Sequence, residues 1–501
     1  MISLVGRLKE SPSQEMIDLL FKPSIRSDLK HHYSYLLKIN SVHLFMLKSE
    51  GIISDEAASK IHSVLTHLQV TGKEALSINP ALEDLYFNVE AYIIEQTGPE
   101  IGGQMHTGRS RNDILATVTR MRIREEMIEI YELVCTLRRT LIDLATEHTS
   151  TLMTGYTHLQ PAEPITFAHY LSALLHGFER DFTRLYNCYA HINKSPLGSC
   201  ALASTTFSIN RKFTMELLGF ADLLENSLDG IASRDYALEA LSALSIFSNS
   251  LSRFAQDLYT WCSYEFGYLE VGHSVAVISS IMPQKKNPVT LEHIKAKAGH
   301  IQGALVSSLS VLKNTLYSHS RDTSMESMKY TWEAINETKA AIRLMIKTLQ
   351  TLTVHKDNMA ATTRQNFSTV TELANALVRH YHFSFRTAHH IVAEIVNETL
   401  NQGLGSDKIE ASAVERAIKQ VTAKTVSVTK EFVEQALDPE RNISLRTVRG
   451  GSAPVEVARQ LQQLEQTLAS DHQKISDLKQ ALQSADQLYK RYAAELERGA
   501  Q

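Results

Sequence analysis

Long stretches of this chain contain neither glycine nor proline, and this feature limits the possible folds more than any other. One such stretch lies between Gly108 and Gly155, a second between Gly230 and Gly267, and a third covers residues 304–402. Because glycine and proline form most tight turns, a chain with only 21 glycines and 11 prolines in 501 residues has few places to reverse direction. This argues against sandwiches, propellers and barrels and predicts long helices with few breaks.

Two of these stretches repeat apolar residues at alternating spacings of four and three, which places them on one face of a helix. The first set is Ile123, Met127, Ile130, Val134, Leu137, Leu141 and Leu144, and the second is Ala237, Leu241, Leu244, Phe247, Leu251, Phe254, Leu258 and Trp261. At about 1.5 Å per residue, the helices are on the order of 35–50 Å long. Such helices are unstable alone, so we expect a bundle that joins helices of one chain or of several chains.

The helix breakers also divide the chain into three predicted domains. Residues 1–105 are expected to form a small, mostly helical N-terminal domain, and residues 106–354 the central bundle of long helices. Residues 355–501, where breakers become more frequent, are expected to form a small helical C-terminal domain with a helical extension.

Charge and cysteine content exclude several classes of protein. With 51 basic and 55 acidic residues the net charge is −4, which gives no electrostatic reason to bind nucleic acid or an anionic membrane. No uncharged stretch reaches the roughly 18 residues that a membrane helix needs, and charged residues precede any signal-peptide core. The four cysteines, Cys135, Cys188, Cys200 and Cys262, contain no CxxC pair and are predicted to be buried thiols. We therefore expect a cytoplasmic protein.

Three polar segments interrupt the helical pattern, and the first is MHTGRSRND at residues 105–113. Ser110 and Asn112 suit a helix N-cap, so capping alone could explain them. A glycine, a serine and two arginines at a helix N-terminus also suit the binding of a carboxylate or phosphate by N–H groups, helix dipole and guanidinium. From the residues alone both interpretations stay open.

The second segment, GYTHLQP at residues 155–161, presents His158 between Thr157 and Gln160. A single histidine is more often structural than catalytic. However, histidine is the side chain best able to exchange protons near neutral pH, and the neighbouring hydroxyl and amide favour a functional role.

The third segment, ISSIMPQKKNP at residues 278–288, holds two serines, two lysines and an asparagine between apolar residues and prolines. Serine is a poor base unless a cation, a helix N-terminus or the exclusion of water stabilises its alkoxide. Lys285 could also neutralise a carboxylate. A basic turn without function is the simpler alternative.

Signals for a metal or nucleotide cofactor are missing from the sequence. The pairs His31–His32 and His389–His390 are adjacent, so a helix would point their side chains apart, and no HExxH, GxxxxGK[ST] or GxGxxG motif occurs. We expect no cofactor and no metal site.

The three segments, in this order and separated by long helices, resemble the argininosuccinate lyase family of the fumarase/aspartase superfamily. The third segment contains the signature loop of the superfamily, SSIMPQKKNP (279–288). Further motifs that fit are HTGRSRND (106–113), GYTHLQ (155–160), SPLGSCALASTTF (195–207), SLDGIASRDY (227–236), FRTAHHIV (385–392), LDP (437–439) and GGSAP (450–454). The resemblance covers almost the whole chain, apart from a C-terminal extension.

The resemblance implies an all-α, three-domain fold with a central long-helix bundle, assembled as a homotetramer. Its active sites would each be shared by three subunits, every one of which contributes one polar segment. The implied reaction is an anti elimination that breaks a carbon–nitrogen bond of the amidine type in argininosuccinate and releases arginine and fumarate, a step of arginine biosynthesis. No cofactor takes part.

The resemblance also implies a role for individual residues. Ser279 matches the base that removes a Cβ proton, and the resulting aci-carboxylate must be held by preorganised donors such as Lys285. His158 matches the histidine that assists proton transfer to the leaving nitrogen or orients a water, and Glu292 matches its charge partner. The implied substrate-binding residues are Ser24, Asp28, Ser110, Arg111, Asn112, Thr157, Gln160, Arg234, Ser280, Met282, Asn287 and Tyr317.

The segment after Tyr317 departs from the family pattern. Family members usually carry a glutamine and a lysine that help to bind substrate, where this chain has Asp322 and Met325. The departure leaves open a lyase for another N-substituted aspartate, as in relatives that act on aminopolycarboxylic acids. A non-catalytic structural paralogue, like the lens crystallins of the family, is a further alternative, but the intact Ser279 and His158 argue against it.

Overall fold

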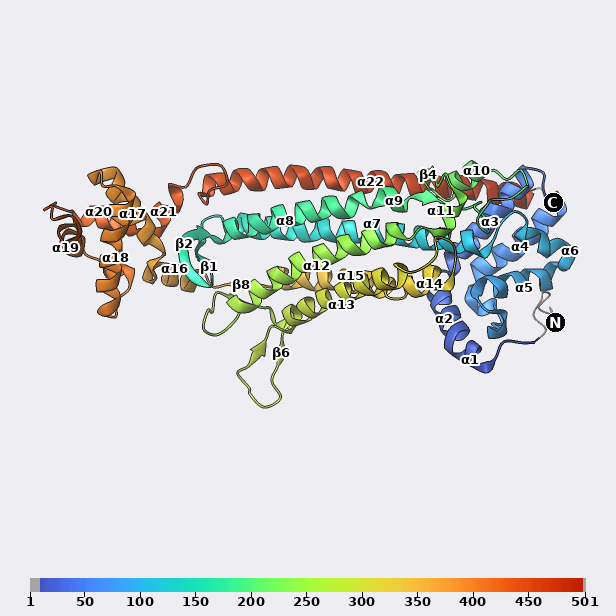
Figure 1. Ribbon diagram of the computed structural model, residues 1–501, viewed down its shortest axis with the longest axis horizontal. Coiled ribbons are helices and arrows are strands. Elements are labelled where there is room, and N and C mark those ends of the chain that lie inside the picture. The colour runs from blue at the N-terminus through green and yellow to red at the C-terminus, as the bar shows by residue number, and fades with distance from the viewer. Residues whose placement is uncertain (1–9, 499–501) are drawn as a thin grey trace.

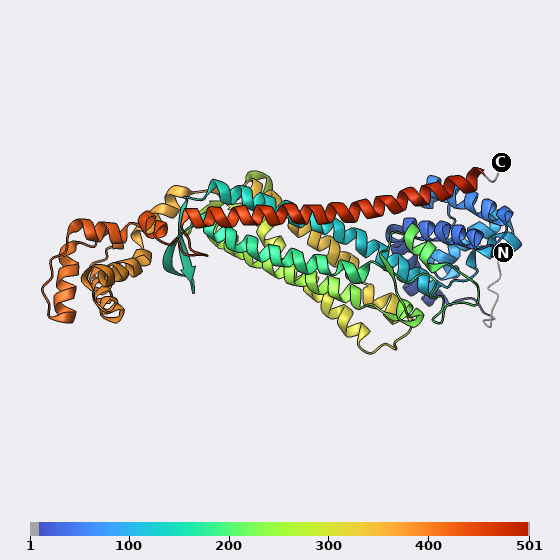
Figure 2. The ribbon, with the colours of Figure 1, turned by 90° about the horizontal axis from the view of Figure 1, so that it is seen from above.

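The computed structural model describes residues 10–498, and helices make up most of it (Figure 1). The N-terminal helices are α1 (Gln14–Met16), α2 (Lys22–His31), α3 (Tyr33–Ser49), α4 (Asp55–Thr71), α5 (Leu85–Thr97) and α6 (Pro99–Gly102). The long helices of the central bundle are α7 (Arg111–Glu147), α8 (Phe167–Asn187), α12 (Asp235–Trp261), α13 (Val289–Leu312) and α15 (Thr331–Gln350). They lie side by side along the long axis of the molecule (Figures 1 and 2).

Shorter elements connect the long helices and form the C-terminal end. The connecting helices are α9 (Tyr189–Ile192), α10 (Arg211–Leu217), α11 (Ser227–Ala232) and α14 (Arg321–Ser324). The C-terminal helices are α16 (Lys356–Gln365), α17 (Val370–Tyr381), α18 (Phe385–Asn401), α19 (Ala411–Thr422), α20 (Lys430–Leu437), α21 (Pro439–Ser444) and α22 (Pro454–Arg498). One π-helical turn (Ile17–Phe21) and the 3₁₀ turns Lys73–Ala75, Pro80–Leu82, Gly103–His106, His273–Val275, Glu326–Met328, Phe367–Thr369 and Ser406–Lys408 complete the helical elements.

Both predicted apolar faces are confirmed. The first lies on α7 and the second on α12, and all their positions are buried except Leu144, which is partly buried against the same core. Ser110 is the N-cap of α7, and its hydroxyl accepts a hydrogen bond from the Asn112 N–H while the Asp113 carboxylate accepts one from the Ser110 N–H. This capping box satisfies N–H groups that a helix start otherwise leaves unpaired.

The expected helical fold is confirmed in that the structure is mostly helical, and a few short strands accompany the helices. The strands are β1 (Leu152–Thr157), β2 (Gln160–Thr166), β3 (Lys194–Ser195), β4 (Asp222–Leu223), β5 (Leu269–Glu270), β6 (Val277–Ile278), β7 (Lys286–Asn287) and β8 (Thr353–Val354). Only the antiparallel β1–β2 hairpin is long. Its sequence contains Gly155, Pro161 and Pro164, which disfavour a helix, and β-branched residues, which favour strands.

Buried apolar residues form three clusters. The largest joins α7, α8, α12, α13, α15 and the first half of α22. A second joins α3, α4 and α5 to the start of α7 and includes Leu496 near the end of α22. The third lies among α17–α20. The predicted domain limits at residues 105 and 354 stay a prediction, because both α7 and α22 contribute to two clusters.

The predicted helical tail is the longest helix, α22, of 45 residues. It leaves the C-terminal helices, runs along α7 and α8, and ends beside the N-terminal helices (Figure 2). Arg138 of α7 and Asp471 of α22 form a buried ion pair at 2.6 Å. Within residues 10–498, no helix combines the length and the apolar composition needed to cross a membrane.

Candidate active site

The first polar segment forms the N-terminus of α7, where the Arg111 side chain is held in place. Its Nη1 donates to Glu83 and Asp84, at 2.8 Å each, and its guanidinium lies 4.1 Å from the centre of the Phe87 ring. Burial opposes the charge on Arg111, but the two carboxylates outweigh it and raise its pKa. The side chain of Asn112 donates to the carbonyl of Ala201 at 3.0 Å.

Asp113, to which the sequence analysis gave no role, connects two of the family motifs. Its buried carboxylate accepts hydrogen bonds from the N–H groups of Ser110, Gly198 and Cys200, at 3.1, 3.0 and 2.8 Å. Burial raises the pKa of Asp113 to about 6, although these donors oppose the shift. The motif at residues 195–207 is thereby fixed to the start of α7. The available signal was the capping-box spacing of Ser110 and Asp113.

Four more predicted substrate residues lie at the same end of the bundle. Asp28 and Arg111 line a small pocket, and Ser24 lies one turn before Asp28 on α2. The Tyr317 hydroxyl donates to Asp229, and this hydrogen bond raises the pKa of Tyr317 to about 12.

Arg234 precedes α12 at this end and is 2% exposed. Its Nη1 donates to the carbonyls of Ser233 and Ile231, at 2.6 and 3.3 Å. Its Nε and Nη2 have no hydrogen-bond partner among the residues that the structure describes. Buried N–H groups without a partner are costly, so a ligand oxygen that reached these groups would be bound favourably.

The second polar segment is the tip of the β1–β2 hairpin. Thr157 pairs with Gln160, and His158 and Leu159 form the two-residue turn with φ of +53° and +57°. All four side chains are exposed. At the base of the hairpin, the hydroxyls of Tyr156 and Tyr268 are 2.6 Å apart.

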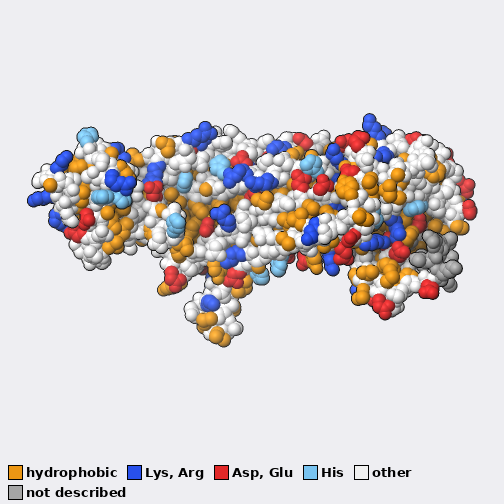
Figure 3. Space-filling model, in the orientation of Figure 1, with side chains coloured by type: hydrophobic (Ala, Val, Ile, Leu, Met, Phe, Trp, Pro, Cys, Tyr) orange, Lys and Arg blue, Asp and Glu red, His pale blue; other side chains and the backbone are white. Residues whose placement is uncertain are grey.

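The third segment is a loop between β6 and β7 that projects from the bundle (Figure 1). Apolar side chains are prominent on this projection (Figure 3), and Ile278 at the end of β6 and Ile281 in the loop are each 84% exposed. The Ser279 Oγ accepts hydrogen bonds from the N–H groups of Ile281 and Met282, at 3.3 and 3.0 Å. Two such donors favour negative charge on this oxygen, in the direction that a serine base would need.

The remaining predicted site residues of this segment are neighbours of Ser279 in the sequence. Ser280 and Lys285 are exposed, and Asn287 lies on β7 and is half-buried. Glu292 is exposed in the first turn of α13.

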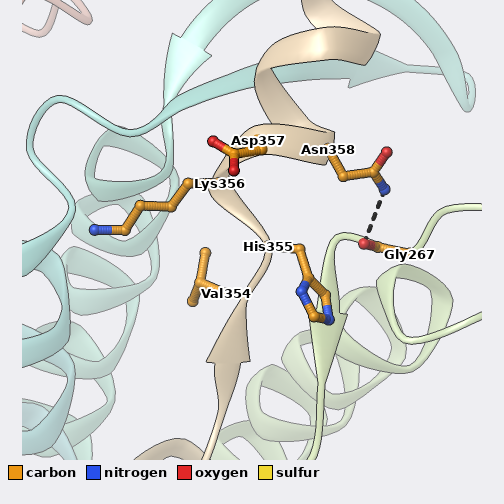
Figure 4. Close-up of a pocket in the computed structure, with 6 residues that line it drawn as sticks. All are labelled: Gly267, Val354, His355, Lys356, Asp357 and Asn358. Carbon is orange, nitrogen blue, oxygen red and sulfur yellow. Dashed lines mark hydrogen bonds between the residues drawn. The ribbon is translucent and has the colours of Figure 1, made fainter.

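An ion pair fixes the base of the loop. Lys286 Nζ lies 2.6 Å from Glu270 Oε1, and His355 Nε2 lies 3.7 Å from the other oxygen of Glu270. A shallow pocket beside it is lined by Gly267, Val354, His355, Lys356, Asp357 and Asn358. Figure 4 shows the Asn358 side chain, which donates to the Gly267 carbonyl at 2.9 Å. None of the predicted site residues lines this pocket.

One chain does not bring the three segments together. Ser110 and the hairpin lie at opposite ends of α7, whose 37 residues span about 55 Å. The signature loop leaves the hairpin end of the bundle in another direction (Figure 1). A site that uses Ser110, His158 and Ser279 therefore needs more than one copy of the chain. No three His, Cys, Asp or Glu side chains in residues 10–498 are grouped as metal ligands would be.

Comparisons with known proteins agree with the motifs. A family model described as lyase matches residues 37–303, and one described as argininosuccinate lyase C-terminal matches residues 367–444. The chain is 99% identical to argininosuccinate lyase 1 of Shouchella clausii over 498 residues, which cover 99% of this chain and 100% of that protein. It is 38% identical to argininosuccinate lyase of Methanosarcina acetivorans, over 96% of each chain.

Solved structures of related lyases have a fold similar to that of this chain. A crystal structure of EDDS lyase in complex with formate has a TM-score of 0.88 at 31% identity, and the match covers 99% of this chain and 98% of that one. A class II fumarase from Schistosoma mansoni has a TM-score of 0.68 at 15% identity, over 82% of this chain and 90% of that one, a likeness of fold alone.

Proposed function

The chain belongs to the argininosuccinate lyase family, and from this premise we propose that it cleaves argininosuccinate to arginine and fumarate. The near-identity to argininosuccinate lyase 1 of Shouchella clausii over its full length supports this substrate. The observation that carries the chemistry is the environment of Ser279, whose oxygen faces two backbone N–H groups in the signature loop.

In the proposed elimination, Ser279 removes a Cβ proton of the succinyl group. The electron pair moves toward the neighbouring carboxylate, and Lys285 and Asn287 hold the charge that develops there. The carbon–nitrogen bond then breaks, and His158 assists the transfer of a proton to the leaving nitrogen, with Glu292 as its charge partner. Ser110, Arg111, Asn112 and Thr157 complete the pocket for the fumaryl half. Arg111 uses only Nη1 in its ion pairs, so its other N–H groups stay available.

We propose a homotetramer whose active sites are shared by three subunits. The separation of Ser110, His158 and Ser279 within one chain supports shared sites. The surface of α13 supports the assembly, because Gly299 and Gly303 face open space and Val306 is 61% exposed. A face of small and apolar residues on a long helix suits close contact with another helix.

The proposed setting is arginine biosynthesis in the cytoplasm, with a small-molecule substrate and no cofactor. All four cysteines are free thiols, of which Cys262 is half-buried and the other three are buried. Such thiols fit a reducing compartment.

The test is fumarate release, followed by ultraviolet absorbance, from argininosuccinate and from a panel of other N-substituted aspartates. We expect argininosuccinate to have the highest kcat/KM. A preference for another member of the panel would replace the substrate, and no fumarate from any of them would refute the lyase.

The second candidate is a lyase for another N-substituted aspartate. Met325 and Asp322, in the segment that departs from the family, favour it, as does the likeness to EDDS lyase. The same panel separates it from the first candidate.

A further inference from the structure

The segment that departs from the family brings a cation of its own to the substrate end of the bundle. Arg321 opens the short helix α14, and its Nη2 lies 3.7 Å from Asp84 and 3.8 Å from Glu83. These are the two carboxylates that Arg111 binds at 2.8 Å. Two guanidinium groups from distant parts of the sequence therefore lie beside each other at the start of α7.

Arg321 is the guanidinium of this pair that can turn to a ligand. Its contacts with Glu83 and Asp84 are longer than hydrogen bonds, and its side chain is 45% exposed, compared with 28% for Arg111. At 3.7 and 3.8 Å these ion pairs lack hydrogen bonds, so they hold Arg321 only weakly and a substrate carboxylate can replace them at small cost.

The neighbours of Arg321 belong to the predicted leaving-group side. His319 lies two residues earlier. Burial, and then the positive charges of Arg234, Arg321 and Arg111, lower the pKa of its ring to about 4. The Nδ1 of His319 is buried and has no partner in residues 10–498. Arg321 and Arg234 thus both lie close enough to His319 to act on its charge, and Nε and Nη2 of Arg234 have no partner among the described residues.

The contacts of Met325 and Asp322, the two departures from the family pattern, fit a role for Arg321 in place of the family lysine. The sulfur of Met325 lies 3.1 Å from Nη1 of Arg321, so the guanidinium reaches the position where relatives have a lysine. The Asp322 carboxylate accepts hydrogen bonds from the Ser320 hydroxyl and the Thr323 N–H, and the first of these does most to lower its pKa. These hydrogen bonds hold the charged carboxylate within the first turn of α14, against Ser320 and Thr323.

We propose that Arg321 binds the α-carboxylate of the arginine half of argininosuccinate and so determines specificity for the leaving amine. This inference rests on the proposed function. Argininosuccinate has three carboxylates, and the residues proposed for the fumaryl half bind two of them. The third is on the arginine half, and a guanidinium binds a carboxylate through two parallel hydrogen bonds.

The test compares arginine with agmatine, which is arginine without its carboxylate. Calorimetric titration measures the affinity of both compounds for the wild type, Arg321→Met and the control Lys329→Met. Lys329 is a cation of the same segment, 58% exposed, with only a 4.0 Å contact to Glu326. We expect the wild type and the control to bind arginine about tenfold or more tightly than agmatine, and Arg321→Met to lose this preference.

Agmatine affinity serves as the control for folding, because a variant that binds it normally has an intact site. An equal loss of both affinities, an unchanged preference for arginine in Arg321→Met, or no preference in the wild type would each overturn the inference. In the same variants, KM for argininosuccinate should rise about tenfold in Arg321→Met while kcat changes little. If the wild type does not cleave argininosuccinate, but prefers arginine to agmatine and loses this preference in Arg321→Met, the proposed function fails and the carboxylate-binding role of Arg321 stands.

Discussion

Ser279 is the residue on which the proposed elimination depends most directly. We predict that Ser279→Ala lowers kcat for argininosuccinate by about 10²–10⁴-fold, the usual contribution of an acid–base group. The melting temperature should stay unchanged, because the loop lies outside the three apolar clusters. Gln284→Ala, which changes an exposed side chain of the same loop, is the control and should keep most of the activity. A Ser279→Ala enzyme with more than about a tenth of wild-type turnover would make Ser280 the better candidate.

His319 should make the stability of the protein depend on pH. Burial and the charges of Arg234, Arg321 and Arg111 lower its pKa from 6.5 to about 4, so the folded state favours the neutral ring. The resulting contribution of His319 to folding stability is complete above pH 6.5 and is lost as the pH falls through about 4. We expect the melting temperature of wild type to fall more steeply over this range than that of His319→Gln. Parallel curves would show that the ring is not held neutral.

The residues that sequence alone could identify are those within continuous motifs. Ser110, His158 and Ser279 stand out because capable side chains interrupt a helical pattern, and the structure adds the N–H donors that face Ser279. Arg321 carries no such signal. Its partners Glu83 and Asp84 are more than 200 positions away in the sequence, and only the fold brings them together.

At the scale of elements, the signature loop depends on the two-residue strands β6 and β7 and on one ion pair at its base. We predict that Glu270→Gln, which removes the partner of Lys286, speeds proteolysis or hydrogen exchange within residues 279–285 and lowers kcat several-fold. The pair is partly exposed, so global stability should change by less than about 1 kcal/mol. Glu265→Gln, an exposed carboxylate in the same connection, is the control. If both variants behave like the wild type, the ion pair does not hold the loop.

The attachment of α22 depends on a buried charge. Asp471 pairs with Arg138, and the two side chains are 3% and 0% exposed. Asp471→Asn leaves Arg138 buried without its counter-ion, so we predict a loss of about 3–5 kcal/mol in unfolding free energy. Asp486→Asn, which removes an exposed carboxylate of the same helix, should cost less than about 1 kcal/mol. Urea denaturation compares the two, and equal midpoints would contradict the argument.

Helices were predictable where apolar residues recur on one face. They were less predictable where the position of a helix depends on contacts with distant parts of the chain. The apolar faces of α7 and α12 follow from the spacing of their apolar residues alone. The tail from residue 455 was predicted to be helical, but its course along α7 and α8 depends on side chains such as Asp471 that the sequence does not mark. The β1–β2 hairpin was missed, although Gly155 and two prolines within 15 residues of chain disfavour a helix there.

For the whole molecule, the proposed shared sites require that His158 and Ser279 reach an active site from separate subunits. A subunit with a defective His158 can still supply Ser279, and a subunit with a defective Ser279 can still supply His158. We therefore predict that His158→Asn and Ser279→Ala proteins, each inactive alone, regain activity when they are mixed, dissociated and reassembled.

The size of this recovery follows from random assembly. In an equal mixture, half of the subunits that supply His158 and half of those that supply Ser279 are intact, so about a quarter of the sites are restored. Each variant reassembled with itself is the control and should stay inactive, and sedimentation should show tetramers in every sample. Tetramers without recovered activity would mean that one subunit supplies both residues, and an active monomer would refute shared sites altogether. Recovery near a quarter would instead require the two residues to come from different chains.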